Sequence, residues 1–401
     1  MSENKVRFCN KCVESNQRFM TSAQHNLTDN KQNSFIDFDE DGVCLACKFF
    51  ERKKSFDWNS REKELENILD RHRKSDGSYD VLVPGSGGKD SIFTSFILRD
   101  KYKMNPLTCT WAPAIYTDVG KQNFDSWLKS GFANVTFTPN KKVHGLLTRL
   151  AFQNLLHPFQ PFALGQYSYP FKVALEKNIK LIIYGDGESE RAAKKDNIKT
   201  KDSLKENKKF YRRNYYRKEN EKIYLGGLDV ETLIKDYNLK LSDLVPYFPV
   251  LEKVMLESEI EVMPITKYIN YNPQKNYYFA KEKTDFQVNP DGRSEGTYTK
   301  YSSLDDKLDG LHHYTWFIKT GRGRTTEDAA IEVRNEIITR EDAIMLVKKY
   351  DGEFPKKYFS DCLEFMNLNE KEFVEIIDKF RSEKIWQNKN NNWILKNAVW
   401  K

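Results

Sequence analysis

The chain has 401 residues and a mass of 47.2 kDa, which is enough for two or three domains. Hydrophobic residues make up 39% and charged residues 31%, and this balance excludes collagen-like, low-complexity and wholly disordered chains. The net charge is +7, but residues 191–222 hold 13 Lys and Arg against 5 Asp and Glu, so the remaining residues sum to −1. The chain is therefore near-neutral with one cationic segment, and we expect no nucleic-acid partner.

Strand-like and helix-like segments alternate between residues 60 and 265. This alternation predicts a parallel sheet with right-handed crossovers, which is a doubly wound α/β fold. The expected strands are 79–83, 107–111, 135–137, 181–184 and 261–265, and the expected helices are 60–73, 92–98, 120–129, 143–155, 230–237 and 241–244.

Composition divides the chain into three expected regions. Residues 1–58 are polar and carry four of the six cysteines, residues 59–270 hold the sheet with the basic segment 191–222 as an insertion, and residues 271–401 are mainly helical and rich in aromatic side chains. No apolar run approaches the roughly 18 residues that cross a bilayer, and the first residues lack the apolar stretch of a signal peptide. We therefore expect a cytoplasmic protein with no membrane partner.

Four cysteines form two C-x-x-C pairs in the first region. They are Cys9 with Cys12 and Cys44 with Cys47, separated by 31 residues. Two such pairs supply the four thiolates of a tetrahedral Zn²⁺ site, and because the protein fills all four positions, the metal is expected to be structural. A redox pair is the weaker interpretation, because a redox C-x-x-C normally opens a helix after a strand.

The segment Pro84–Ser91 reads PGSGGKDS and lies between an expected strand and an expected helix. Such a loop points backbone N–H groups and the positive end of the helix at an anion. Neither a Walker A loop nor a dinucleotide fingerprint fits, because Asp90 stands where the first needs Ser or Thr and the second needs Gly. The candidate nucleotide-binding residues are Gly85, Ser86, Gly87, Gly88, Lys89, Asp90, Ser91, Trp111 and Gly185.

A second glycine-containing turn, Tyr184–Glu190, follows a later strand. In a doubly wound sheet both turns lie at the carboxyl ends of strands, where ligands bind. Asp186, Glu188 and Glu190 are therefore candidates to hold Mg²⁺ together with Asp90, or to orient a substrate. The alternative is a solvated acidic turn.

The residues SGGKDS resemble the PP-loop of the N-type ATP pyrophosphatases. Longer segments resemble the bacterial N-acetyl sugar amidotransferases, which supply acetamidino groups to surface sugars of the pseudaminic acid, legionaminic acid and lipopolysaccharide types. The likeness runs from the first C-x-x-C pair to the final tryptophan and is weakest over 191–222. The segments that carry it are Pro106–Asp118, Ser130–Asn140, Val143–Pro161, Glu295–Lys307 and Phe317–Arg324.

This resemblance implies a reaction with ATP and Mg²⁺. The carbonyl oxygen of an N-acetyl group attacks the α-phosphate of ATP, pyrophosphate leaves, and ammonia then displaces AMP to leave an acetamidine. Lys89, Asp90, Asp186 and Glu188 are the catalytic candidates. The chain shows neither an N-terminal cysteine nor a G-x-C-x-G nucleophile, so the resemblance implies a separate glutaminase and a channel subunit of the imidazole glycerol phosphate synthase kind.

Residues 303–320 are expected to form one helix. Leu304, Leu308 and Leu311 lie on its apolar stripe, and Asp305, Asp309, His312, Trp316 and Lys319 lie on the next stripe, which suits a sugar cleft. Arg322 and Arg324 follow in a glycine turn that can receive a carboxylate or a nucleotide phosphate on the sugar. The candidate substrate residues are Asp305, His312, Lys319, Arg322 and Arg324, and the alternative is a partly solvated helix face.

A tRNA-thiolating enzyme is the main competing hypothesis, because such enzymes also combine a zinc module with a PP-loop and the basic segment suits RNA. Thiolation in that family needs catalytic cysteines or an iron–sulfur cluster near the loop. After the two C-x-x-C pairs only Cys109 and Cys362 remain. A scaffold without enzymatic activity leaves the phosphate loop unexplained.

Overall fold

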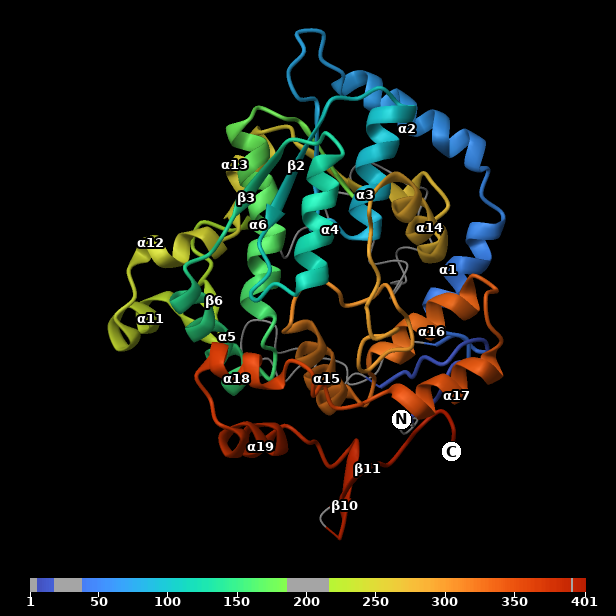
Figure 1. Cartoon of the computed structure of the whole chain (residues 1–401), viewed down its shortest axis with the longest axis vertical. Coiled ribbons are helices and arrows are strands. Elements are labelled where there is room, and N and C mark those ends of the chain that lie inside the picture. The colour runs from blue at the N-terminus through green and yellow to red at the C-terminus, as the bar shows by residue number, and fades with distance from the viewer. Residues whose placement is uncertain (1–5, 18–37, 186–215, 391) are drawn as a thin grey trace.

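Five parallel strands form the central sheet of this computed structural model, which describes residues 6–17, 38–185, 216–390 and 392–401 (Figure 1). Leu82 of β1 pairs with Leu107 of β2 on one side and with Ile182 of β4 on the other. The strand order changes direction between β1 and β4, which is where ligands bind in such sheets. In the order β3-β2-β1-β4-β9, the strands are Asn134–Phe137, Pro106–Trp111, Val81–Pro84, Leu181–Tyr184 and Glu261–Pro264.

Helices cover both faces of this sheet, and the remaining strands form short pairs elsewhere. The helices up to residue 257 are α1 (Leu45–Lys54), α2 (Trp58–His72), α3 (Lys89–Phe96) with the π-turn η1 (Ile97–Lys101), α4 (Asp118–Lys129), α5 (Lys141–Leu155), α6 (Gln160–Glu176), α11 (Val230–Tyr237), α12 (Leu241–Leu244) and α13 (Glu252–Glu257). The short strands are β5 (Tyr216–Arg217), β6 (Tyr224–Leu225), β7 (Leu228–Asp229) and β8 (Val250–Leu251), and the 3₁₀ turns are η2 (Val245–Tyr247) and η3 (Ile265–Lys267).

The C-terminal region is mainly helical, as predicted. It ends in an antiparallel hairpin of β10 and β11, which follows the helices in Figure 1. Its elements are α14 (Pro273–Lys283), α15 (Asp309–Thr320), α16 (Arg324–Arg334), α17 (Arg340–Tyr350), α18 (Phe359–Met366), α19 (Glu370–Lys379), β10 (Trp386–Lys389) and β11 (Asn392–Leu395).

Alternate residues of β1 pack against different helical layers. Val83 shares a buried cluster with Leu69 of α2, whereas Leu82 shares one with Phe171 of α6. A strand buried on both faces requires a continuous apolar run, which is what the sequence of β1 shows. The predicted doubly wound α/β fold is therefore confirmed.

Helix α6 is absent from the sequence-based expectations. It contains Pro161, Gly165 and Pro170, which interrupt the helical pattern. Pro161 lies in the first turn, where a missing N–H costs no intrahelical bond. Gly165 is required by close packing, because a Cβ there would lie 2.1 Å from the Trp111 ring.

The prediction of one helix over 303–320 is wrong in its first third. Helix α15 begins only at Asp309, and the preceding residues run along the loop between β2 and α4, with an antiparallel bridge between Tyr116 and Asp306. The buried Asp306 carboxylate accepts from the backbone N–H groups of Ala114 at 2.6 Å and Leu308 at 2.9 Å. These tertiary hydrogen bonds outweigh the local helical pattern.

The cysteine region packs on the C-terminal helices and not on the sheet. Val13 and the four cysteines share a buried cluster with Ala329 of α16 and with Ala343 and Val347 of α17. Figure 1 shows α1 and the short N-terminal strand-like trace beside these two helices. The predicted boundaries at residues 58 and 270 stay predictions.

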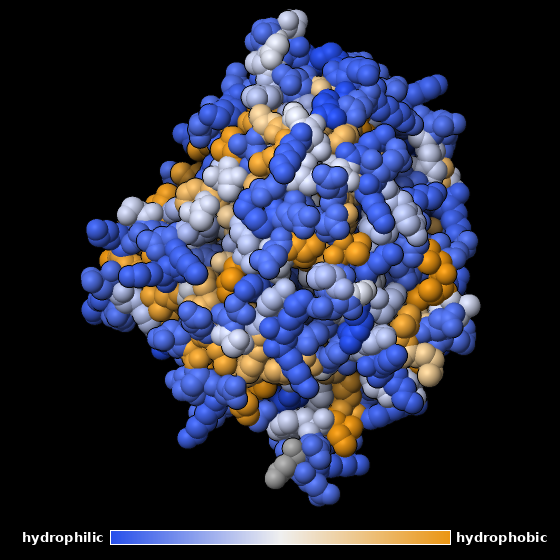
Figure 2. Space-filling view, in the orientation of Figure 1, coloured by the Kyte–Doolittle hydropathy of each residue, from blue (hydrophilic) through white to orange (hydrophobic). Residues whose placement is uncertain are grey.

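The surface in Figure 2 is mostly hydrophilic, with apolar atoms in small separate patches. Within the described ranges, no helix has the length and apolar character needed to cross a membrane.

Candidate active site

The glycine loop joins β1 to α3 and faces a cavity. Its start is fixed by a hydrogen bond from the Gly85 N–H to the Cys109 carbonyl at 2.9 Å. Gly87 has φ +82°, and a Cβ there would lie 2.6 Å from Cα of Phe124, so both its conformation and its surroundings require glycine. Helix α3 starts at Lys89, and the first N–H groups of a helix have no intrahelical partner. The loop therefore has the geometry of an anion-binding site.

Lys89 and Asp90 form an ion pair beside this loop. Lys89 Nζ lies 2.6 Å from Asp90 Oδ2, and Asn276 Nδ2 of α14 donates to Asp90 Oδ1 at 2.8 Å. Ser91 Oγ donates to the Gly88 carbonyl at 2.9 Å. A role of Asp90 in holding Mg²⁺ thus requires Lys89 to exchange this carboxylate for a phosphate, and that role stays a prediction.

The second glycine turn starts in contact with the helix that follows the first glycine loop. A Cβ on Gly185 would lie 2.7 Å from the Asp90 carbonyl oxygen, so the end of β4 touches the first turn of α3. The acidic candidates of that turn, Asp186, Glu188 and Glu190, lie outside the described residues.

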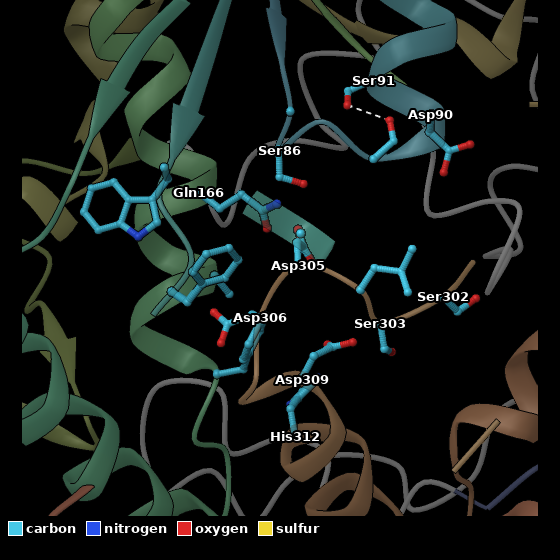
Figure 3. Close-up of a pocket in the computed structure, with 18 of the residues that line it drawn as sticks. Ser86, Asp90, Ser91, Gln166, Ser302, Ser303, Asp305, Asp306, Asp309 and His312 are labelled. Atoms are coloured by element: carbon cyan, nitrogen blue, oxygen red, sulfur yellow. Dashed lines mark hydrogen bonds between the residues drawn. The ribbon is translucent and has the colours of Figure 1, made fainter. Parts of the chain in front are cut away.

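A cavity of about 590 Å³ extends from this loop to the C-terminal region (Figure 3). The loop forms one wall, and residues from 301 to 324 form part of the opposite wall, with Asp305, Asp309 and His312 pointing into the space between. The predicted site residues that line it are Gly85, Ser86, Gly87, Gly88, Lys89, Asp90, Ser91, Trp111, Gly185, Asp305, His312, Arg322 and Arg324.

Asp305 is a C-terminal candidate that reaches the loop itself, through a hydrogen bond with Ser86. The Asp305 carbonyl accepts from the Thr117 N–H at 3.2 Å, and a Cβ on Gly120 would lie 2.4 Å from the Asp305 Cα, so this segment sits directly on the start of α4. Burial raises the pKa of the Asp305 carboxyl, although a hydrogen bond with Ser86 opposes the shift. This contact links the two walls.

His312 and His313 supply two neutral imidazoles to the same wall. Burial lowers the pKa of His312 to about 4 and that of His313 to about 3. His312 stacks on the rings of His157 and Phe159, with centroids 5.1 and 5.0 Å apart. The sequence analysis did not single out His157, Phe159 or His313, because nothing in their local pattern shows that α15 packs on the end of α5.

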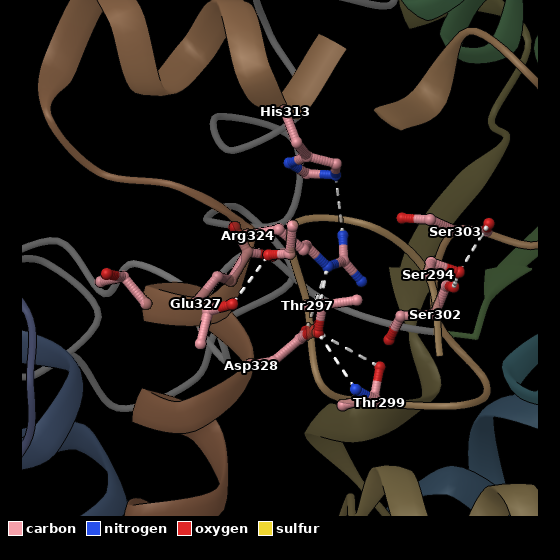
Figure 4. Close-up of polar contacts among 12 residues, drawn as sticks. Ser294, Thr297, Thr299, Ser302, Ser303, His313, Arg324, Glu327 and Asp328 are labelled. Carbon is pink, nitrogen blue, oxygen red and sulfur yellow. Dashed lines mark hydrogen bonds and ion pairs between the residues drawn. The ribbon is translucent and has the colours of Figure 1, made fainter. Parts of the chain in front are cut away.

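Arg324 is held by two neighbours in Figure 4. Its Nη1 lies 3.0 Å from His313 Nε2, and its Nε lies 3.1 Å from Asp328 Oδ1. Asp328 also accepts from the Thr297 hydroxyl at 2.7 Å. The guanidinium is thus fixed in orientation at the cavity wall.

Arg322 is paired with two carboxylates inside the protein, those of Glu14 and Glu327. Its Nε and Nη2 donate to the two carboxylate oxygens of Glu14 at 2.8 and 2.7 Å, and both side chains are buried. Glu14 follows the first C-x-x-C pair, so the cysteine region anchors the glycine turn of the cavity. The predicted role of Arg322 as a receptor for a substrate anion conflicts with this pairing.

Lys319 does not line the cavity. Its side chain is buried, and its Nζ donates to the Leu155 carbonyl at 2.8 Å. The cause is packing, because the face of α15 that holds Lys319 lies on the end of α5 and not on the cavity. We therefore withdraw it from the substrate candidates.

Trp111 lines the cavity with its indole tightly packed. It stacks on Phe137 with centroids 4.9 Å apart, and its Nε1 has no hydrogen-bond partner within the described part of the chain. A buried indole N–H without a partner is costly, which makes this nitrogen available to a ligand acceptor. Its assignment to the nucleotide stays a prediction.

The four sulfurs of the C-x-x-C pairs converge as a metal site requires. They lie within 4.8 Å of one another, with 3.9 Å between Cys9 and Cys47 and 3.7 Å between Cys12 and Cys44. Tetrahedral Zn–S bonds of about 2.3 Å give sulfur pairs about 3.8 Å apart, so the residues fit the ion. Arg334 Nη2 lies 3.7 Å from Cys12 Sγ, which suits thiolates. The set can hold a metal.

The other two cysteines are unsuited to nucleophilic chemistry. Cys109 lies inside β2 and Cys362 inside α18, and both are buried. Burial raises the pKa of both thiols. Because the thiolate is the reactive form, neither is activated.

Comparison with known proteins identifies the C-terminal region. Residues 295–399 match the model of the LPS biosynthesis protein WbpG-like, C-terminal domain. These residues are similar to that domain, and they contribute the wall with Asp305, His312 and Arg324.

Two further matches are either short or weak. An uncharacterized protein of Methanocaldococcus jannaschii, MJ1599, is 32% identical over 77 residues, which are 19% of this chain and 27% of that protein. The chain thus spans about a quarter of that relative. The structure of the U34-tRNA thiolase NcsA from Methanococcus maripaludis with its [4Fe-4S] cluster aligns with 91% of this chain and 100% of that chain, at 11% identity and a TM-score of 0.29. Nothing about this chain follows from a similarity that low.

Proposed function

We propose that this chain, whose residues 295–399 form a WbpG-like C-terminal domain, is an ATP-dependent amidotransferase that converts an N-acetyl group of a bacterial surface sugar to an acetamidino group. One observation carries the proposal: the anion-binding loop and the WbpG-like domain line a single cavity of about 590 Å³. The loop suits the phosphates of ATP, and the domain description supports a sugar of lipopolysaccharide type. The sugar is free or nucleotide-linked.

The proposed chemistry activates a poor electrophile. The N-acetyl carbonyl oxygen bonds to the α-phosphorus of ATP and pyrophosphate leaves, which gives an O-adenylyl imidate. Ammonia then bonds to the imidate carbon, the C–O bond breaks, and AMP leaves with the former carbonyl oxygen, while the amine loses its extra proton. Ser86, Lys89 and the loop N–H groups hold the phosphates that are cleaved off.

Magnesium and the C-terminal wall complete the proposed site. Asp90 and Asp186 are the residues that would hold Mg²⁺, which supplies charge neutralisation on phosphate oxygens. Glu188 is a further catalytic candidate from the same turn. His312 and Arg324 contact the sugar, since both line the cavity that the loop lines. The four-cysteine site holds Zn²⁺ and supports the fold.

Ammonia is proposed to come from a partner. All six cysteines are buried and four of them converge on the metal site, so none resembles a glutaminase nucleophile. The partners we propose are a glutaminase subunit and an ammonia-channel subunit of the imidazole glycerol phosphate synthase kind. The buried, unactivated Cys109 also argues against thiolation of tRNA, because it is the cysteine that lines the cavity.

The test incubates the purified chain with ATP, Mg²⁺, ammonium chloride and a panel of N-acetyl sugars. We expect sugar-dependent release of AMP and pyrophosphate and a sugar product of lower mass, in which =NH replaces =O. The protein should be colourless and contain zinc. Release of ADP, or a brown protein with iron and sulfide, would refute the assignment.

A further inference from the structure

Tyr301 brings an aromatic ring from the C-terminal region to the lysine of the phosphate loop. Lys89 Nζ lies 5.5 Å from the centroid of the Tyr301 ring, and both residues line the active-site cavity. A cation within about 6 Å of a ring centroid is attracted by the negative face of the ring. The ammonium group of Lys89 therefore interacts with this ring as well as with the Asp90 carboxylate at 2.6 Å.

The Tyr301 ring is held in place by two helices. It stacks on Tyr277 of α14, with centroids 5.2 Å apart and planes at 21° to each other. Its hydroxyl donates to Glu332 Oε1 of α16 at 3.3 Å. Helix α14 in turn packs on α3, the helix that begins at Lys89 (Figure 1). The ring is thus fixed relative to the loop by contacts outside the loop.

Glu332 also affects the charge distribution of the ring. This carboxylate is buried, and it accepts from the Tyr298 hydroxyl at 2.6 Å and from Gln274 Nε2 at 3.4 Å. Burial and the charge of Glu332 raise the pKa of the Tyr301 hydroxyl, so it keeps its proton and remains the donor. A phenol that donates to a carboxylate is polarised, and its ring becomes more negative. The contact with Glu332 therefore strengthens the attraction of the ring for a cation.

A neutral ring is a suitable partner for a lysine that must change its anionic partner. When Lys89 turns to the phosphates of ATP, its contact with the Asp90 carboxylate is lost. The Tyr301 ring carries no net charge, so it does not compete with a phosphate for the ammonium group. Its attraction matters more once the carboxylate contact is gone, and a contact that is stronger in one state shifts the equilibrium toward that state. The ring therefore favours the phosphate-bound position of Lys89.

We propose that Tyr301 is a positioning residue for Lys89, and that its ring holds the ammonium group at the loop while Lys89 exchanges Asp90 for the phosphates of ATP. This inference rests on the proposed function. Tyr301 lies within residues 295–399, which match the WbpG-like C-terminal domain model. That region thus contributes to the phosphate side of the cavity as well as to the opposite wall.

The test measures the binding of ATP with Mg²⁺ by calorimetry, without a sugar, so no turnover is needed. Tyr301→Leu removes the ring, whereas Tyr301→Phe keeps the ring and removes only the hydrogen bond to Glu332. Tyr278→Leu, at a position of α14 that is 61% exposed, is the matched control. Both substitutions at 301 are repeated together with Lys89→Met, which completes two double-mutant cycles. Denaturant unfolding identifies a temperature at which each variant is folded.

Tyr301→Leu should raise the Kd for ATP about tenfold, and Tyr301→Phe about threefold or less. In the Lys89→Met background both should change the Kd by less than about twofold, because the ring then has no ammonium group to hold. Tyr278→Leu should bind ATP as the unmodified chain does. Equal increases with and without Lys89 would overturn the inference, since the ring would then act through packing alone. Equal Kd values for Tyr301→Leu and Tyr301→Phe would also overturn it.

The same measurements separate this inference from the proposed function. If the unmodified chain binds ATP but shows no sugar-dependent exchange of pyrophosphate into ATP, the proposed function fails, and the binding data still decide the role of Tyr301. If the unmodified chain does not bind ATP in the presence of Mg²⁺, both are overturned.

Discussion

The two walls of the active-site cavity are built in different ways. The phosphate wall is eight consecutive residues, Pro84–Ser91, between one strand and one helix. The opposite wall depends on contacts between distant positions, such as Asp306 with Ala114 and Arg322 with Glu14, which are 192 and 308 residues apart. A contiguous wall carries its chemistry in a local motif, whereas an assembled wall depends on the stability of every region that contributes to it.

Among the predictions for the assembled wall, the largest loss of stability is expected when the metal site is changed. Cys12→Ser should lower zinc content and thermal stability together, because metal binding and folding are coupled; apparent zinc affinities in finger peptides are about 10–16 kcal/mol. Cys362→Ser is the control, since it is a buried cysteine outside the site. Full zinc occupancy in a Cys9/Cys44 double variant would contradict the assignment.

Glu14→Gln tests the link between the cysteine region and the cavity. It removes the carboxylate that accepts two hydrogen bonds from the buried Arg322 guanidinium and leaves Glu327, at 3.2 Å, as its remaining acidic partner, so the free energy of unfolding should fall by about 3 kcal/mol, the low end of the range for a broken buried pair. The KM for the sugar should rise more than the KM for ATP, as steady-state kinetics at a temperature where the variant is folded would show. Glu51→Gln, which removes an exposed partner of Lys11, should leave the free energy of unfolding nearly unchanged. Equal changes in both KM values would argue for a purely structural link.

A substitution in the contiguous wall should lower turnover and leave the free energy of unfolding nearly unchanged. Lys89→Met removes the cation of the loop, and pyrophosphate exchange should fall about 10²–10³-fold. Lys121→Met is the control, because Lys121 is exposed on α4 and pairs with Asp125. Exchange within about twofold of the unchanged protein would show that Lys89 does not act on the phosphates.

The neutral histidines make the assembled wall sensitive to acid. The pKa of His312 is lowered to about 4 by burial, against about 6.5 in an unfolded chain, so the folded state binds fewer protons between these values. The free energy of unfolding is therefore higher by about 3 kcal/mol above pH ~6.5, where His312 is neutral in both states, and this difference is lost as the pH falls toward ~4. Denaturant unfolding across this range should show a shallower loss for His312→Gln. Parallel curves would place the acid sensitivity elsewhere.

Lys319→Met should have the smallest effect. It removes one hydrogen bond to the Leu155 carbonyl, which is worth about 1 kcal/mol, and the sugar KM should not change. Arg324→Lys, by contrast, should raise the sugar KM, because Arg324 lines the cavity and its fork is held by His313 and Asp328. A raised sugar KM in Lys319→Met would restore Lys319 to the substrate site.

The same contrast explains what could be predicted from the sequence. The strands, the loop and the C-x-x-C pairs depend on short-range patterns, and the structure contains all of them. The start of α15, the burial of Lys319 and the Glu14–Arg322 pair depend on tertiary contacts that no local pattern contains. The sequence does not predict helix α6, because Pro161 and Pro170 interrupt its pattern. In the structure Pro161 lies in the first turn of the helix, and the buried Pro170 is tolerated by packing.

The most direct test of the central claim follows the carbonyl oxygen. An N-acetyl sugar with ¹⁸O in its carbonyl group is incubated with ATP, Mg²⁺, ammonium chloride and the purified chain, and AMP is examined by mass spectrometry. If the phosphate wall activates the group held by the opposite wall, the label appears in the phosphate of AMP. Unlabelled AMP alongside a labelled sugar product would show that the sugar is not adenylated on this oxygen, and the account would fail.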